Sequence, residues 1–369
     1  MRRVLVILVL LALCATSAVV AVISADWPFW QRAWAWHVAG PSGPEHIPGA
    51  WRWIGRGAGA DWPLGPSDSF EAKSLAALAR RVPGDALLLT SEGRLLAEFY
   101  GDGVSPDRLL QGGPLTSAIL PPLYGITSRG GSAVLDAPLR QVLPEFGDDP
   151  RGDITPRQLL WQVSGLELPP WHPLDPFNAQ SRLHAGPNFE RAARAFRGIW
   201  PPGSHFETSP ANAQLAGMVL VSVTGKSLAD LVESELWDAI GAGRARVALD
   251  RLDGAMSAHC CLAATARDWL RLANVYARAG TLNVWPPGFL RDQVVRATAV
   301  HPAYGLGVEI ETLPDGVQML WIGGARRWIL AVPSRQLAVV WIARQDIGRP
   351  EREMLKAALR LQEGSADLL

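Results

Sequence analysis

Four short apolar runs near the C-terminus, separated by turns, constrain the fold of this chain more than any other feature. Runs rich in β-branched and aromatic residues that end at turn sequences such as Pro314-Asp315-Gly316 are typical of successive antiparallel strands. An earlier pair, Ala86–Thr90 and Arg94–Tyr100, flanks Ser91-Glu92-Gly93 and predicts a β-hairpin. The four late runs are Gly305–Glu311, Val317–Ile322, Trp328–Val332 and Leu337–Ala343.

Between the hairpin and these late runs, the spacing of apolar residues predicts helices. Leu115–Ile126 has helical length, but Pro121 and Pro122 should kink or break a helix there. An early strand pair, a helical middle, a strand meander and a terminal helix together make an α+β domain. The other predicted helices are Phe70–Arg81, Thr155–Val163, Ala211–Val223, Leu228–Ile240, Ala264–Ala279 and Pro350–Leu361.

The N-terminus predicts a membrane anchor. Arg2 and Arg3 precede an uncharged run, residues 4–24, which is long enough to cross a hydrocarbon core of roughly 30 Å. Positive charge before the run favours an N-terminus on the cytoplasmic side. We therefore expect a single-pass protein of the inner membrane, bound to it through residues 4–24, with its C-terminal domain in the periplasm.

Two other interpretations of this segment stay open. A cleaved signal peptide would need small residues before the cleavage site, and Ile23 fits that pattern poorly. A lipoprotein signal at Cys14 is weakened by the bulky Leu13. We interpret residues 1–25 as an anchor or signal segment. Residues 26–66, rich in Trp, Pro and Gly, form a linker or wrapping extension, and 67–363 form one domain.

Charge and cysteine content narrow the range of functions. The formal net charge is zero, so the clustered excess of Lys and Arg expected of a nucleic-acid-binding protein is missing. Of the three cysteines, Cys260 and Cys261 are adjacent, and neighbouring residues bridge only with backbone strain. The sequence therefore predicts no disulfide framework and no partner among nucleic acids.

Several strings in the middle of the chain resemble one family. Residues 154–166, Ile-Thr-Pro-Arg-Gln-Leu-Leu-Trp-Gln-Val-Ser-Gly-Leu, are similar to the "ITxRxLLxxxSGL" helix of serine β-lactamase-like hydrolases. Leu135-Asp136-Ala137-Pro138, Thr224-Gly225-Lys226-Ser227-Leu228-Ala229 and the Cys260-Cys261 segment up to Trp269 also resemble it, the last in the 6-aminohexanoate-dimer hydrolase branch. The resemblance implies a β-lactamase/transpeptidase-like α/β/α sandwich with an antiparallel sheet and a helical subdomain.

The same resemblance exposes missing catalytic residues. The family performs nucleophilic acyl transfer with a Ser in S-x-x-K, assisted by the Lys and by a Tyr. Alignment places Leu110 at the position of the Ser, Gly113 at that of the Lys and Thr208 at that of the Tyr. The third motif of the family aligns with Trp321-Ile322-Gly323-Gly324, which contains neither Lys nor His.

These departures favour a catalytically inactive protein with a binding or scaffolding role toward a periplasmic protein or a small-molecule ligand. In this hypothesis Leu110 and Trp321 fill the old pocket, or the pocket still holds a ligand. Arg326 and Arg327 are then candidates for recognising a carboxylate or a phosphate, and His205 and Glu207 are further candidates for ligand binding. No cofactor is expected.

The alternative is an active amide or ester hydrolase with rewired residues. Candidate nucleophiles are Ser117, Ser164, Thr208 and Ser209, with His205 or Glu207 as the base. A metal site is not predicted, because the histidines lack the spacing typical of metal ligands. Those histidines are His172, His184, His205, His259 and His301.

Overall fold

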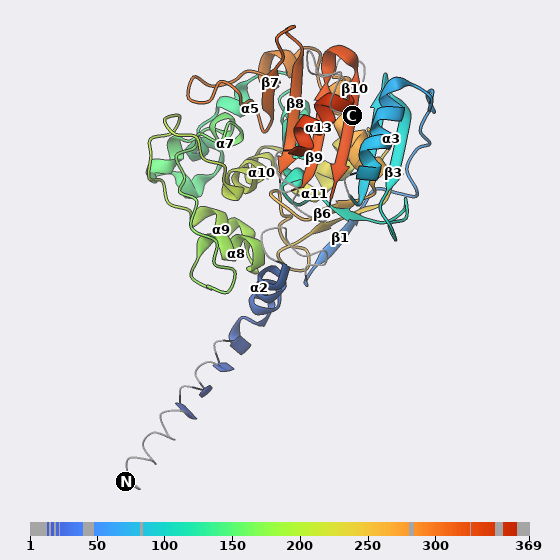
Figure 1. Cartoon of the computed structure of the whole chain (residues 1–369). Coiled ribbons are helices and arrows are strands. Elements are labelled where there is room, and N and C mark those ends of the chain that lie inside the picture. Colours follow the sequence, from blue (N-terminus) through green and yellow to red (C-terminus); the bar gives the residue numbers. More distant parts are fainter. Residues whose placement is uncertain are drawn as a thin grey trace.

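A six-stranded antiparallel sheet, with strand order β3-β2-β10-β9-β8-β7, forms the upper right part of the computed structural model in Figure 1. Strand β10 pairs with β2, which joins the predicted hairpin to the predicted meander. Both groups of predicted strands are therefore confirmed. The strands are β2 Ala86–Ser91, β3 Arg94–Tyr100, β7 Glu309–Thr312, β8 Gln318–Gly324, β9 Arg327–Val332 and β10 Leu337–Ile342.

The structure describes residues 13–39 except 15, 18, 19 and 22, and residues 48–81, 84–279, 284–324, 326–343 and 350–359. Much of the predicted anchor, residues 4–24, lies outside them. Within these ranges, no single helix has both the length and the hydropathy needed to cross a membrane. Pro210–Thr224 and Leu228–Trp237 meet the criteria only as a pair, and they meet at a bend of 82°.

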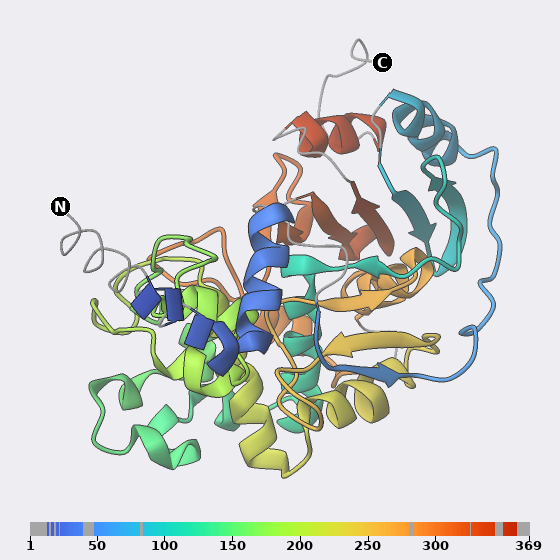
Figure 2. The same ribbon diagram turned by 90° about the horizontal axis from the view of Figure 1, so that it is seen from below.

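Helices cover both faces of this sheet (Figure 2). On one face, α3 (Phe70–Arg81) and α13 (Pro350–Ala358) pack over alternate strand residues such as Leu89 and Trp341. On the other face, α12 (Ala266–Ala277) contacts β2, β9 and β10. The α+β class and the α/β/α layering expected from the sequence are confirmed.

A helical subdomain fills the middle of the chain. At its centre lies α10 (Pro210–Thr224), where every residue from Ala211 to Leu220 is buried, and it packs against α4, α7 and α9. Besides α10, the elements from residue 113 to 237 are η2 Gly113–Ile119, α4 Leu120–Thr127, α5 Ala133–Asp136, α6 Leu139–Val142, η3 Pro144–Phe146, η4 Pro150–Asp153, α7 Pro156–Leu160, α8 Ala179–Ala185, α9 Phe189–Arg194, α11 Leu228–Leu231 and η5 Val232–Trp237. The short helices η6 Leu290–Val294 and η7 Pro333–Arg335 follow later in the chain.

Residues 26–66 contribute regular structure to the domain, where the sequence predicted a linker or wrapping extension. They contain helix α2 (Trp27–Ala39), which packs against α8, and strand β1 (Trp51–Ile54). Strand β1 is the edge of a second, four-stranded sheet of order β1-β5-β6-β4. The other strands of that sheet are β4 Leu110–Gln111, β5 Ala245–Ala248 and β6 Leu262–Ala264.

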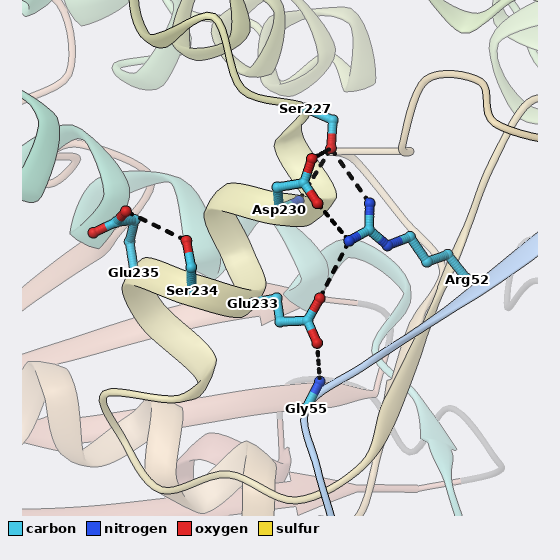
Figure 3. Close-up of polar contacts among 7 residues, drawn as sticks. All are labelled: Arg52, Gly55, Ser227, Asp230, Glu233, Ser234 and Glu235. Carbon is cyan, nitrogen blue, oxygen red and sulfur yellow. Dashed lines mark hydrogen bonds and ion pairs between the residues drawn. The ribbon is translucent and has the colours of Figure 1, made fainter.

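Polar contacts hold β1 against the helices beside it (Figure 3). The guanidinium group of Arg52 forms ion pairs with Asp230 and Glu233, at N···O distances of 2.5 and 3.2 Å. Glu233 also accepts a hydrogen bond from the backbone N–H of Gly55. The N-terminal extension is thus bound to the domain by charge as well as by strand pairing.

Candidate functional site

A cavity of about 380 Å³ lies where the helical subdomain meets the end of β8, in the size range of small-molecule sites. Hydroxyl, amide, imidazole and aromatic groups line it, and no Asp, Glu, Lys or Arg is among its described lining residues. The lining consists of Trp36, Gly113, Pro114, Ser117, Gln162, Gln180, His184, Thr208, Ser209, Pro210, Ala213, His259, Cys260, Tyr304, Gly307, Gly323 and Gly324.

Three aligned motifs converge on this cavity. Gly113, at the position of the Lys in the resembled family, and Thr208, at that of the Tyr, both line it. Gly323 and Gly324, which end the third motif, lie at its edge. Segments far apart in the sequence therefore meet at this cavity, and position 113 holds no Lys and position 208 no Tyr.

Leu110 and Trp321 do not fill this cavity, which corrects that part of the sequence-based hypothesis. Leu110 lies in β4, is 5% exposed and belongs to the hydrophobic core. Trp321 packs in the cluster under α3 and α13, where its indole N–H donates to Glu311 and the Arg352 guanidinium lies 4.8 Å from its ring.

The two candidate arginines also lie outside the lining. Arg327 is 9% exposed, and a Cβ atom added at Gly113 would lie 3.0 Å from its Nη1 atom. The guanidinium group therefore occupies space into which a side chain at position 113 would begin to extend. Because neither Arg326 nor Arg327 lines the cavity, the predicted carboxylate or phosphate contact is not part of this site.

The candidate nucleophiles have local structural partners. Ser117 donates to the carbonyl of Pro114 at 2.9 Å, and Ser209 caps α10 by accepting from the backbone N–H of Ala211 at 3.3 Å. Ser164 is buried and donates to the Asn212 side chain at 2.6 Å. Thr208 is exposed at the cavity edge. The described contacts thus explain these serines as turn, cap and packing residues.

His205 and Glu207 do not complete a catalytic pair in the cavity. His205 is exposed and stacks on Trp200, with ring centroids 4.0 Å apart. Glu207 donates its backbone N–H to the carbonyl of Gln162, and neither residue is among the described lining residues. Neither residue therefore lies where a base for a cavity hydroxyl is needed.

The structure adds Tyr304 to the site. Its ring lines the cavity and packs edge-to-face against Phe206 at a centroid distance of 5.1 Å. Burial raises the pKa of the Tyr304 hydroxyl above its ordinary value, so this group stays protonated at neutral pH. Sequence reasoning missed Tyr304 because it lies far along the chain from the aligned Tyr position, and no local motif marks it.

Aromatic rings close one end of the cavity. Trp36 of α2 and His184 of α8 have ring centroids 4.7 Å apart, as do His184 and His259. Trp171 lies 5.0 Å from His184. Burial lowers the pKa of His184 to about 4 and that of His259 well below its ordinary value, so both imidazoles are neutral at pH 7.

Beside these rings, Cys260 and Cys261 form a disulfide. The sequence-based expectation that adjacent cysteines do not bridge is therefore wrong. The backbone accommodates the bridge with Cys261 in the left-handed region, at φ +76°. No cluster of three or more His, Cys, Asp or Glu side chains suited to a metal ion occurs within the described ranges.

Comparisons with known proteins agree with this fold. The sequence pattern of the beta-lactamase family matches residues 68–363. A protein of Bacillus anthracis assigned provisionally as a 6-aminohexanoate-dimer hydrolase has a similar structure, with a TM-score of 0.71 and 18% identity over 85% of this chain and 90% of that chain.

Two further solved structures are similar. The class C beta-lactamase of Rhodobacter sphaeroides has a TM-score of 0.56 and 18% identity over 79% of this chain and 98% of that chain. FmtA of Staphylococcus aureus has a TM-score of 0.62 and 15% identity over 84% and 94%. No curated protein shows significant sequence similarity to this chain. At these identities the structural likeness concerns the fold alone.

Proposed function

The chain belongs to the beta-lactamase family, and we propose that it is a catalytically inactive member that binds a small molecule or a periplasmic protein. The lining of the cavity supports this proposal most directly. The family uses a Lys and a Tyr for proton transfer, and this chain has Gly113 and Thr208 at the aligned positions. A glycine carries no titratable group, and a threonine hydroxyl is a poor base at neutral pH.

The position aligned with the nucleophile supports the same conclusion. Leu110 lies in the core, and its backbone carbonyl accepts a hydrogen bond from the indole of Trp269 at 3.0 Å. An apolar side chain provides no nucleophilic atom, and this one does not face the ligand space. At the positions aligned with the family's motifs, the cavity therefore has neither the nucleophile nor the bases of that family, which favours binding over acyl transfer.

The alternative is a hydrolase with rewired residues, which Ser117, Thr208 and Ser209 favour because each places a hydroxyl at the cavity wall. Such a nucleophile needs a base within hydrogen-bonding reach. The bonds described for Ser117 and Ser209 go instead to backbone groups. The inactive reading is therefore the better supported of the two.

Labelling and turnover separate these functions. We would treat the folded full-length chain with a fluorophosphonate probe, p-nitrophenyl esters and nitrocefin, beside an active member of the family and the variants Ser117→Ala and Thr208→Val. We expect no covalent adduct and no turnover above that of the heat-unfolded chain. An adduct on one hydroxyl, with turnover lost in the matching variant, would establish the rewired hydrolase.

We also propose that residues 4–24 bind the protein to the inner membrane and that the domain faces the periplasm. The Cys260–Cys261 disulfide supports this location, because disulfides persist in oxidising compartments. Protease added to spheroplasts should digest the domain, and the intact chain should resist carbonate extraction from membranes. Digestion only after lysis would contradict the proposed orientation.

A further inference from the structure

Three buried polar atoms at the aromatic end of the cavity lack hydrogen-bond partners among the described residues. They are Nε1 of Trp36, Oε1 of Gln180 and Nε2 of His259, and all three residues line the cavity. Trp36 is 7% exposed and His259 is 5% exposed. Most buried polar groups in folded proteins are paired, so three unpaired atoms on residues that line one cavity are candidates for pairing with a bound ligand.

These atoms come from three separate elements. Trp36 lies in α2, Gln180 in α8 and His259 in the loop before β6. His259 is fixed from behind, where its Nδ1 atom lies 3.2 Å from the Ser257 hydroxyl. The His184 ring lies against both Trp36 and His259. The fold therefore brings residues with an N–H donor, a carbonyl acceptor and an imidazole nitrogen to the lining of one cavity.

The uncharged lining of the cavity favours an uncharged ligand. Among its described residues the cavity wall has no carboxylate, ammonium or guanidinium group, and both of its imidazoles are neutral at pH 7. An ionic ligand would lose its hydration there without contacting a charged group among the described lining residues, which is costly. A neutral ligand with a donor and an acceptor would pay a much smaller desolvation cost.

We propose that this end of the cavity binds a small, uncharged ligand of the carboxamide class. Its carbonyl accepts from Trp36 and its N–H donates to Gln180, while His259 pairs with either group. Because these atoms are buried, this binding requires the side chains to rotate toward the ligand. This ligand class rests on the proposed binding function, which implies that the bound ligand is not hydrolysed.

Benzamide, benzoate and benzamidinium test this inference, because they share one shape and differ in charge. Benzamide donates and accepts, benzoate only accepts, and benzamidinium only donates. Binding to the full-length chain at pH 7.5 would be followed by ligand-observed NMR titration. We expect saturable binding of benzamide that is at least about tenfold tighter than that of either ion, the ratio that 1.4 kcal/mol would give.

Two variants locate the bound ligand. Trp36→Phe removes the N–H but keeps an aromatic ring, and Gln180→Leu removes the carbonyl. Each should weaken benzamide binding about fivefold, as expected for one lost hydrogen bond. Trp62→Phe is the matched control, because the Trp62 indole N–H is also buried and unpaired but lies outside the cavity lining. It should bind benzamide like the parent chain.

The outcomes separate this inference from the proposed function. Stronger binding of an ion, no saturable binding by the folded chain, or unchanged affinity in both variants would overturn the carboxamide site. The same NMR samples report hydrolysis, in which benzamide and water give benzoate and ammonia. Benzoate formation with the binding preference intact would overturn the inactive function and leave the ligand class standing.

Discussion

At the scale of single residues, the Cys260–Cys261 disulfide predicts the number of free thiols. The chain has three cysteines, and Cys14 is the free one among those described. Iodoacetamide applied to the denatured, unreduced chain should therefore add one carbamidomethyl group, and three after reduction, as measured by intact mass. Both bridged residues are 4% exposed, so in the native protein we expect slow reduction. Three adducts without reductant would contradict the bridge.

The buried histidines predict acid sensitivity. In the unfolded chain His184 has a pKa near 6.5, whereas burial lowers its folded-state pKa to about 4. Between these values the unfolded chain binds a proton that the folded chain does not, so the free energy of unfolding falls as the pH falls through this window. For His184 the loss by pH 4.5 is about 2.5 kcal/mol, and His259 adds a loss of the same sign.

Urea unfolding at pH 7 and pH 4.5 measures this effect. His184→Gln should lose less stability between the two pH values than the parent chain, although it starts lower because it leaves a packed aromatic cluster. His172→Gln is the control, because His172 is exposed. An equal loss of unfolding free energy between the two pH values in all three proteins would show that protonation of His184 does not cause the loss.

At the scale of elements, the contacts of α2 depend on Arg32. Its guanidinium group is buried and donates to the carbonyls of Pro48, Gly186 and Leu249 at 2.8 to 3.2 Å. Arg32→Lys keeps the charge, but an ammonium group cannot reach three divergent carbonyls. We expect a loss of about 2–4 kcal/mol in the free energy of unfolding, since buried carbonyls lose charged donors.

Chemical denaturation measures this loss, with Gln31→Ala as the control on the exposed side of the same helix. The control should change stability by less than about 0.5 kcal/mol. If Arg32→Lys lowers the free energy of unfolding no more than the control does, these hydrogen bonds make no net contribution to stability.

The sequence predicted most elements but misjudged some of their ends. Thr155 and Gln158 form the capping box of α7, but that helix ends at Leu160, and Gln162 adopts φ +58°. The segment Leu115–Ile126 divides where its prolines predicted a kink or break: η2 ends at Ile119, and Pro121 and Pro122 lie in the first turn of α4, where N–H groups need no helical partner. Helix α2 was missed because its tryptophans occupy both the buried and the exposed side, which leaves no single apolar stripe.

At the scale of the whole molecule, the aligned motifs were enough to predict where the cavity lies. They did not predict its chemistry. Leu110 and Trp321 belong to two different hydrophobic clusters, which depends on packing that no local sequence pattern records. Trp36, His184 and His259 come from distant segments with no motif spacing among them, so only the fold could bring them together.

The N-terminal extension supports both the stability of the domain and the cavity, which leads to the last prediction. A chain that begins at residue 67 loses β1 from the edge of its sheet and Trp36 from the cavity wall. It also exposes the core that Phe29 and Ile54 cover, both fully buried. At about 1.5–3 kcal/mol for each large apolar side chain, these two alone account for about 3–6 kcal/mol, a large part of the roughly 5–15 kcal/mol by which a typical domain is stable. We expect this fragment to be largely unfolded, whereas a chain that begins at residue 25 should unfold like the full-length protein and bind benzamide with the same affinity.

Circular dichroism and denaturation of the two fragments test this. A well-folded fragment from residue 67 would show that the extension is dispensable, and retained benzamide binding in it would remove Trp36 from the ligand site.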